Sequence, residues 1–226
     1  MSHNITVEGG TSVRLPTAGK YCDRDIIVTA TGGGGTDTTI KDFVEGNQLE
    51  INDETVTKIR TRAFNYATNL IAVNFPNAES VSSYAFAECT SLISADLPNV
   101  TTATTTFLFD GCISLKNVNI PKVASVSNYA FRDCEALEKI ELGNISSCGS
   151  YAFSNATSLV TVIIRRDGTQ VTSLSATNAF NGTPIANGTG FIYVPKNLMD
   201  NFKSAKNWST YSAQFRAIED YPEICG

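Results

Sequence analysis

The stretch SSYAFAECTSLISADLPNV at residues 82–100 sets the pattern for most of this chain. Close variants recur as SNYAFRDCEALEKIELGNI at 127–145 and GSYAFSNATSLVTVIIR at 149–165, and looser copies lie at 61–78 and 105–123. One phenylalanine marks each copy, so the repeat is 22 or 23 residues long: Phe64, Phe86, Phe109, Phe131 and Phe153. Self-similarity at this period is typical of stacked coils, none of which buries its own apolar face alone.

Each copy divides into two halves. The second half reads Leu-x-x-Val-x-Phe, as in Leu70, Val73 and Phe75, and its last two apolar positions alternate with the period of a strand. The first half places Phe86 and Cys89 three residues apart, which is the spacing of one helical face. We therefore expect each coil to contain one strand, a turn and about one helical turn. The turn is often marked by a proline, at Pro76, Pro98 and Pro121.

Three of the six cysteines occupy one repeated position, three residues after the marker phenylalanine. Cys89, Cys112 and Cys134 stand there, and the flanking copies have Ala67 and Ala156. A position shared by cysteine and alanine suits a small buried side chain, so we expect reduced, buried thiols. Cys148 stands where other copies have valine, which also indicates the core. Cys22 and Cys225 are unassigned, and no cysteine pair has the spacing of a metal site.

The start of the chain forms a separate unit, a small N-terminal β module at residues 1–31. Ile5 and Val7 alternate with polar residues and 26–30 is β-rich, which predicts two or three short strands. Such a small sheet is marginal alone and is expected to lean on the repeats or on another subunit. GGGGTDTT at 32–39 has the composition of a flexible linker, and the solenoid is expected over 40–195 with a degenerate first coil.

The end of the chain, 196–226, is expected to form a helical C-terminal cap. Two short amphipathic helices are predicted there, one from Leu198, Phe202 and Ala205 and the other from Tyr211, Phe215 and Ile218. Ser209 suits the N-cap of the second helix, and Trp208 would wedge between the two.

The repeated strand and its Tyr-Ala-Phe-x-x-Cys-x-x-Leu turn resemble the leucine-rich repeats of the BspA-like type over roughly residues 55–195. The resemblance implies an α+β repeat solenoid, a right-handed coil of about five 22-residue repeats. The chain departs from many leucine-rich repeats because no asparagine or cysteine ladder follows the strand, where Val100 and Val123 stand.

Two further stretches carry weaker resemblances. Residues 179–195 and 206–221 are similar to the C-terminal ending of such proteins in gut Firmicutes and their phages. The opening unit, with LPTAGKYCDRDIIVTA at 15–30, resembles small modules of phage tail-associated proteins. That resemblance implies that homo-oligomer or virion assembly would run through the N-terminal module.

The composition disfavours several functions. The formal net charge is −5, from 17 Lys+Arg and 22 Asp+Glu, and no basic cluster indicates nucleic-acid binding. No apolar run has the length of a membrane span or of a signal-peptide core, so we expect synthesis in the cytoplasm without a signal peptide. His3 is the only histidine, which leaves nucleophilic triads without a base. We therefore expect no enzyme activity and no cofactor.

Two rows of side chains are candidate binding surfaces. The first is the residue between the two apolar positions of each strand, which should point outward: Asn74, Asp96, Asn119, Glu141 and Ile163. Rungs about 4.8 Å apart would make this a polar strip for a sugar chain, a basic peptide or a partner loop, although a merely solvated sheet face explains it too. The second row lies two residues before each marker phenylalanine: Tyr84, Phe107, Tyr129 and Tyr151. These rings could form a sugar platform or a subunit contact, or could pack on one another.

Taken together, the sequence predicts a non-enzymatic recognition or structural module. A phage or prophage tail-associated protein that contacts a glycan or protein on a bacterial surface fits best, located in the virion. The alternative is a cell-surface or secreted leucine-rich repeat adhesin, although the chain ends EDYPEICG without a recognisable anchor motif. A hydrolase is disfavoured because base and paired-carboxylate motifs are missing.

Overall fold

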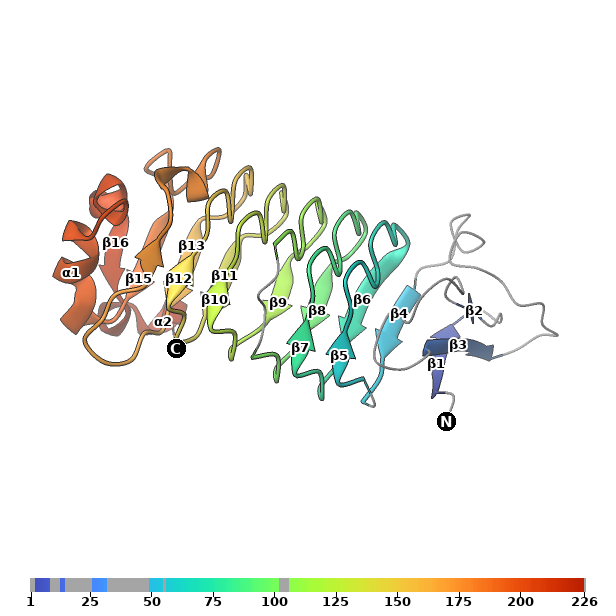
Figure 1. Cartoon of the computed structure of the whole chain (residues 1–226). Coiled ribbons are helices and arrows are strands. Elements are labelled where there is room, and N and C mark those ends of the chain that lie inside the picture. Colours follow the sequence, from blue (N-terminus) through green and yellow to red (C-terminus); the bar gives the residue numbers. More distant parts are fainter. Residues whose placement is uncertain are drawn as a thin grey trace.

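The computed structural model describes residues 3–8, 13–14, 26–31, 49–54, 56–101 and 106–225, with side chains from residue 50 onward. The predicted linker at 32–39, Cys22 and residues 40–48 of the predicted first coil lie outside these residues. Figure 1 shows the repeats stacked side by side along one axis, from β4 at one end to α1 at the other.

The first strands of the chain form a three-stranded sheet. They are β1 (His3–Glu8), β2 (Val13–Arg14) and β3 (Ile26–Thr31), in the order β1-β3-β2. β1 runs parallel to β3, and β2 runs antiparallel to it. The short strands predicted in this part of the sequence are therefore confirmed.

Each repeat contributes one longer strand, and these strands pair in parallel. They are β4 (Leu49–Asn52), β6 (Leu70–Asn74), β8 (Ser94–Asp96), β9 (Asn117–Asn119), β11 (Lys139–Leu142), β13 (Thr161–Ile164) and β15 (Phe191–Val194). Two-residue strands follow most of them: β5 (Lys58–Ile59), β7 (Ser80–Val81), β10 (Ser125–Val126), β12 (Ser147–Cys148) and β14 (Ser173–Leu174). The strand predicted from the Leu-x-x-Val-x-Phe pattern is confirmed.

The longer strands make two sheets rather than one. The first is β4-β6-β8-β9 and the second is β11-β13-β15-β16. Within residues 106–225 no β ladder joins β9 to β11, and we call this junction the seam. At the seam Gly143 replaces the usual proline, and a Cβ built there would lie 2.0 Å from the carbonyl oxygen of Pro121. The backbones approach too closely for a side chain at this point.

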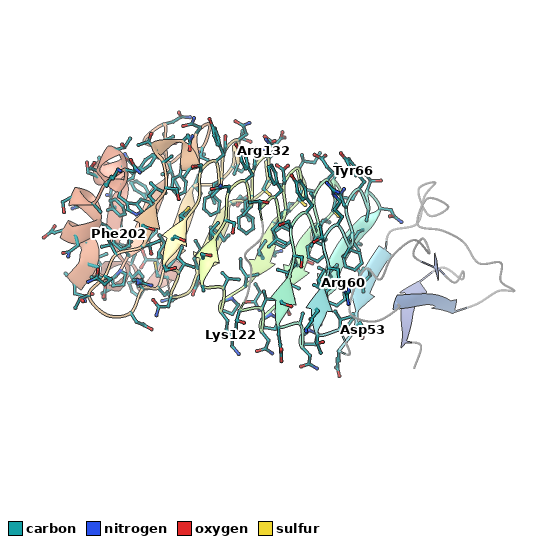
Figure 2. The ribbon with its side chains drawn as sticks, viewed as in Figure 1. Asp53, Arg60, Tyr66, Lys122, Arg132 and Phe202 are labelled. Atoms are coloured by element: carbon teal, nitrogen blue, oxygen red, sulfur yellow. The ribbon has the colours of Figure 1, made fainter. Side chains whose placement is uncertain are left out.

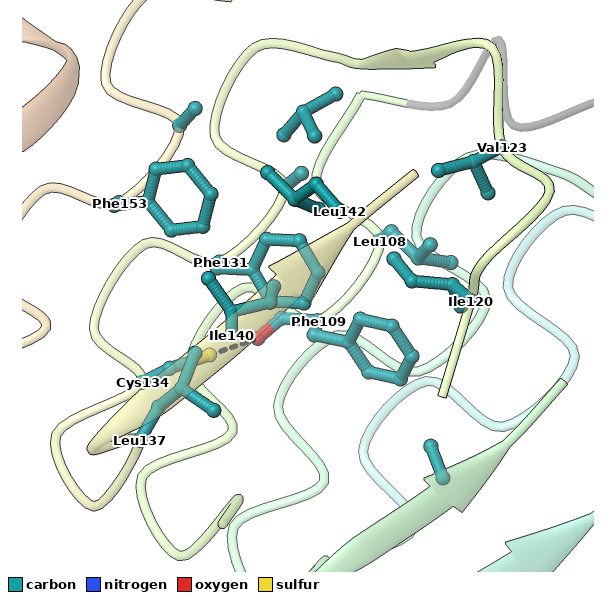
Figure 3. Packing of buried hydrophobic residues seen from close by; sticks show 14 of the residues in the cluster. Leu108, Phe109, Ile120, Val123, Phe131, Cys134, Leu137, Ile140, Leu142 and Phe153 are labelled. Carbon is teal, nitrogen blue, oxygen red and sulfur yellow. Dashed lines mark hydrogen bonds between the residues drawn. The ribbon is translucent and has the colours of Figure 1, made fainter. Parts of the chain in front are cut away.

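A column of phenylalanine rings runs through both halves of the core. Neighbouring marker rings stack with centroids 5.2–5.4 Å apart, from Phe64 to Phe180. All of them are buried, as the repeat predicted. Figure 3 shows Phe109, Phe131 and Phe153, which span the seam, among the aliphatic side chains of the strands. The hydrophobic core is therefore continuous where the sheet is not.

The repeated cysteines lie in this core. Cys89, Cys112 and Cys134 are free and buried, which confirms their predicted position. Each thiol also donates to the main-chain carbonyl oxygen of the marker phenylalanine in the preceding copy, which is Phe64, Phe86 and Phe109 in turn, at 2.9, 3.0 and 3.2 Å. The last of these bonds is drawn in Figure 3. Alanine can fill this position but cannot make the bond. Burial raises the pKa of the Cys112 and Cys134 thiols.

The prediction of a helical turn in the first half of each copy is wrong for the five regular repeats. Residues 83–88 are turns, and the equivalent residues of the other copies are turns or bends. Tyr84 and Glu88 have φ values of 59° and 61°, in the left-handed region. Alternate N–H groups donate to the next coil, as Phe86 does to Leu108 at 3.0 Å. Hydrogen bonding between coils thus replaces hydrogen bonding along a helix. The next copy, whose marker is Phe180, instead has a short 3₁₀ helix at this position, η2 (Thr177–Phe180).

An asparagine ladder does follow the strand, contrary to the departure inferred from Val100 and Val123. It lies one residue earlier than expected. Asn77 donates through Nδ2 to the carbonyl oxygen of Glu54, and Asn99 to that of Pro76, both at 2.7 Å. Lys122 takes this position at the seam and donates to Asn99 Oδ1 at 2.5 Å instead.

The C-terminal segment contains both helix and strand. Its elements are η3 (Lys196–Leu198), α1 (Met199–Ser204), η4 (Trp208–Gln214), β16 (Phe215–Ala217), η5 (Ile218–Asp220) and α2 (Pro222–Cys225). The first predicted helix is confirmed as η3 and α1. Trp208 is fully buried against Phe180 and Phe202.

The second predicted helix is wrong over Phe215–Ala217. These residues form β16, which pairs in parallel with β15. Phe215 and Ala217 are buried and Arg216 between them is not, which is the period of a strand. The open edge of β15 also offers main-chain groups that only a strand can satisfy in series.

Candidate functional site: the outer face of the strands

The outward row of the first sheet is polar throughout. Asn52, Asn74, Asp96 and Asn119 are neighbours on adjacent strands in exact register. Asn74 Nδ2 donates to Asn52 Oδ1 at 3.1 Å, and Asn119 Nδ2 donates to Asp96 Oδ1 at 2.7 Å. The structure thus brings together three of the four polar residues singled out from the sequence. Glu141 lies across the seam on β11.

Two hollows lie over this row. The larger has a volume of about 620 Å³ and spans the seam, with Asp96, Asn117 and Asn119 on one side and Glu138, Lys139 and Glu141 on the other. The smaller, about 490 Å³, lies over β4, β6 and β8 and shares Ser94 and Asp96 with the first. Asn74 lines the smaller hollow, and its Oδ1 is buried without a hydrogen-bond partner. Asp96 is therefore the one charged residue common to both.

The polar strip ends at Glu141, because the next outward residue does not face solvent. Ile163 was expected to point outward, and it does leave the main core, but none of its surface is exposed. It packs with Tyr193 and Cys225 in a second, smaller cluster. Ile163 is therefore not part of an exposed strip, since the end of the chain covers it.

Glu141 and its neighbour Lys139 hold that covering segment. Lys139 Nζ donates to the carbonyl oxygen of Ile224 at 2.5 Å. Glu141 pairs with Arg165, which raises the pKa of the guanidinium, and Arg165 also donates to the carbonyl oxygen of Cys225. Neither Arg165 nor the covering segment was singled out from the sequence. The sequence feature that could have indicated the covering segment is the change from polar residues to Ile163 in the outward row.

The aromatic row forms a stack on another edge of the coils. Neighbouring rings of Tyr84, Phe107, Tyr129 and Tyr151 have centroids 4.6–5.2 Å apart and planes within 7° of parallel. Arg62 lies 5.1 Å from the centroid of the Tyr84 ring, which covers the stack at that end. The faces of the inner rings are therefore occupied by other rings.

A half-buried ion pair lies beside this stack. Arg132 makes two hydrogen bonds to the carboxylate of Asp110, at 2.7 and 2.8 Å, and these bonds raise the pKa of the guanidinium. Its guanidinium also lies 5.0 Å from the Tyr129 ring centroid. Figure 2 places Arg132 along the same long edge as Tyr66, opposite the edge of Lys122. The sequence feature that could have indicated this ion pair is that Asp110 and Arg132 stand at equivalent positions of adjacent copies.

Among the residues that the structure describes, no group of three or more His, Cys, Asp or Glu side chains is placed to hold a metal ion. No helix among the same residues is long and apolar enough to cross a membrane.

The chain belongs to the BspA type leucine-rich repeat family. Residues 57–186 match that family as six copies of the repeat, one more than the five regular copies read from the sequence. No curated protein matches the chain.

Solved structures with a similar fold come from three bacteria. A leucine-rich repeat protein of T. pallidum is 19% identical with a TM-score of 0.41, covering 68% of this chain and 61% of its own. A leucine rich cell surface protein of Faecalibacterium prausnitzii is 19% identical with a TM-score of 0.39, covering 72% and 48%. A leucine-rich repeat protein of Bacteroides ovatus is 16% identical with a TM-score of 0.35, covering 80% and 63%. This chain thus matches less than two thirds of the length of each of them.

Proposed function

We propose that this protein is a non-enzymatic recognition module that binds a protein or glycan on a bacterial surface. Its partner would lie on the outer face of the strands, over Asn74, Asp96, Asn119 and Glu141. The observation that carries the proposal is the larger hollow, which gathers amides, carboxylates and two ammonium groups on one face. Such a set can donate and accept hydrogen bonds toward a polar partner at several points.

Binding is favoured over catalysis by how these groups are engaged. Asp96 accepts from Asn119, Glu141 pairs with Arg165, and Lys139 holds a main-chain carbonyl. The arrangement presents fixed hydrogen-bonding groups, which is what recognition needs.

We assign the aromatic row, Tyr84, Phe107, Tyr129 and Tyr151, to holding the turns in register. A glycan platform needs open ring faces, and here the faces meet one another. The row is kept as the second candidate surface, because the rings are only half-buried.

The location of this module, in a virion tail or at a cell surface, is proposed from sequence resemblance. The opening unit resembles small modules of phage tail-associated proteins, which favours a place in a virion tail, with assembly through that unit. The alternative, a cell-surface or secreted adhesin, agrees equally well with the leucine-rich repeat family. Neighbouring genes distinguish the two, since tail or baseplate genes support the first and a sortase or export locus supports the second.

Adsorption to bacterial cells tests the binding face. Fluorescently labelled protein is incubated with cells, and bound protein is counted by flow cytometry. Asn117→Arg, which fills the hollow, and Asp96→Ala with Asn119→Ala, which removes its polar groups, should each lower adsorption at least tenfold. Glu135→Arg is the control, because Glu135 is exposed and lines neither hollow.

Two further arms identify the partner and the face. Loss of adsorption after protease treatment of the cells indicates a protein, and loss after periodate oxidation indicates a glycan. If the hollow variants adsorb like the wild type while Tyr129→Ala with Tyr151→Ala does not, the binding face is the aromatic row.

A further inference from the structure

The outer face of the second sheet carries apolar side chains that the repeat does not require. Ile163 and Tyr193 are aligned with Glu141 across β11, β13 and β15, in the row that is polar on the first sheet. They form a cluster with Cys225 that is separate from the main core, with Tyr221 and Ile224 packed at its border. Apolar residues on a face that is otherwise solvated indicate a surface built to be covered.

The segment that covers this surface, residues 221–225, is called the cover, and it is held in two ways. Its main chain is fixed by cations, since Lys139 and Arg165 donate to the carbonyl oxygens of Ile224 and Cys225. Its side chains rest on the apolar floor, and the rings of Tyr221 and Tyr193 meet edge to face with centroids 5.5 Å apart. Carbonyl recognition does not depend on the bound sequence, whereas the apolar floor selects an aromatic and an aliphatic side chain.

The cover is attached weakly compared with the rest of the fold. The helix α2 has only four residues, and Pro222 and Glu223 within it are exposed. Its apolar contacts belong to the smaller cluster, so lifting it leaves the phenylalanine column intact. Segments with few buried contacts open locally at a free-energy cost well below that of global unfolding.

We propose that Ile163, Tyr193, Lys139 and Arg165 form a peptide-binding site, which the chain's own Tyr221–Cys225 occupies in this structure. Its external ligand is a short acidic peptide of a partner protein, with an aromatic residue three positions before an aliphatic one. The acidic preference follows from the charges around the site, where Lys139, Arg165 and Arg216 outnumber Glu141, the carboxylate that pairs with Arg165. The site does not rest on the proposed function, although Lys139 and Glu141 are shared with the larger hollow.

The chain's own segment supplies the probe for a test in trans. A fluorescein-labelled peptide of residues 218–226, carrying Cys225→Ser to prevent disulfide exchange, is titrated into the full chain. In the wild type the attached segment competes at high effective concentration, so binding should be weak. Ile224→Asp in the full chain puts a carboxylate against the apolar floor and unseats the segment. That chain should bind the peptide at least tenfold more tightly, measured by fluorescence anisotropy.

Two matched controls show where the peptide binds. A peptide that itself carries Ile224→Asp should not bind, and Arg165→Ala added to the Ile224→Asp chain should weaken binding at least tenfold. The melting temperature of the Ile224→Asp chain should stay within about 3 °C of the wild type, because the main core is untouched. If that chain does not fold, Tyr221→Ser takes its place, since Tyr221 is only half-buried.

The proposal is overturned by either of two results. One is equal binding, or none, to the wild-type and unseated chains. The other is equal binding of the normal and Ile224→Asp peptides, which means that the interaction is nonspecific.

Discussion

The two sheets formed by the longer strands have inner faces of the same kind and outer faces of different kinds. Inward, both contribute buried aliphatic and small side chains to one core. Outward, the first sheet presents Asn52, Asn74, Asp96 and Asn119, whereas the second presents Glu141, Ile163, Tyr193 and Arg216 in the equivalent row. The first row is open and the second is largely covered by the end of the chain. The repeat therefore constrains the inside of each coil, and the outside is free to acquire function.

The largest effect is expected from breaking what the two sheets share. Phe131 is 1% exposed and stacks on Phe109 and Phe153 on either side of the seam. Phe131→Ala should cost about 3–5 kcal/mol of unfolding free energy, because it leaves a cavity in the column. Urea denaturation followed by circular dichroism measures this. Ile113→Ala, at a side chain 43% exposed, is the control and should cost less than about 0.5 kcal/mol. Equal stability of both variants would mean that the column does not carry the core.

A smaller loss is expected from crowding the seam. Gly143→Ala places a methyl group against the Pro121 carbonyl oxygen, so the backbone must shift. Overpacking of this kind costs about 1–3 kcal/mol. Thr157→Ala, an exposed position in the following copy, should leave the urea midpoint unchanged. A neutral Gly143→Ala would show that the two sheets are not in close contact there.

The buried thiols predict a dependence of stability on alkaline pH. Burial raises the pKa of Cys148 from 9.0 to about 12, so the thiol ionises above pH 9 only when the chain unfolds. Its contribution is fully present below pH 9 and is lost as pH rises, at up to about 1.4 kcal/mol per pH unit. Cys148→Val, the residue found in equivalent positions, should remove this part of the slope. Parallel urea midpoints for wild type and variant between pH 9 and 11 would contradict the account.

The aromatic row should contribute the least of these. Tyr129→Ala removes ring contacts with Phe107 and Tyr151 and the contact with Arg132. Stacked pairs at a half-exposed site contribute about 0.5–1.5 kcal/mol, so a modest loss of stability is expected. Adsorption to cells should not change. A variant of unchanged stability but lost adsorption would reverse the assignment of the two rows.

Most of the buried architecture could be predicted from the sequence alone. The spacing of the phenylalanines, the alternation in each strand and the Cys/Ala position predicted the core correctly, because each is repeated five times under the same packing constraint. The turns were missed because a three-residue spacing fits a helix and a left-handed turn equally well. The left-handed positions carry Tyr84 and Glu88, not only glycine, so residue type gave no warning.

The outer face was predicted less well. Asn74, Asp96 and Asn119 form the expected row because their orientation follows from strand period. The loss of Ile163 from that row depends on a segment 60 residues later in the chain, and no local pattern reports such a contact. The strand at Phe215–Ala217 was missed for the same reason, since the edge of β15 decides it.

Chemical footprinting of carboxylates tests whether the partner binds over the larger hollow. The protein is labelled with a carbodiimide and an amine, alone and bound to the bacterial envelope to which it adsorbs, and mass spectrometry reads each acid. Asp96 and Glu138, which line the larger hollow, should lose reactivity on binding, while Glu135 and Glu54 should keep theirs. Unchanged reactivity of Asp96 and Glu138 in the bound state would contradict binding over that hollow.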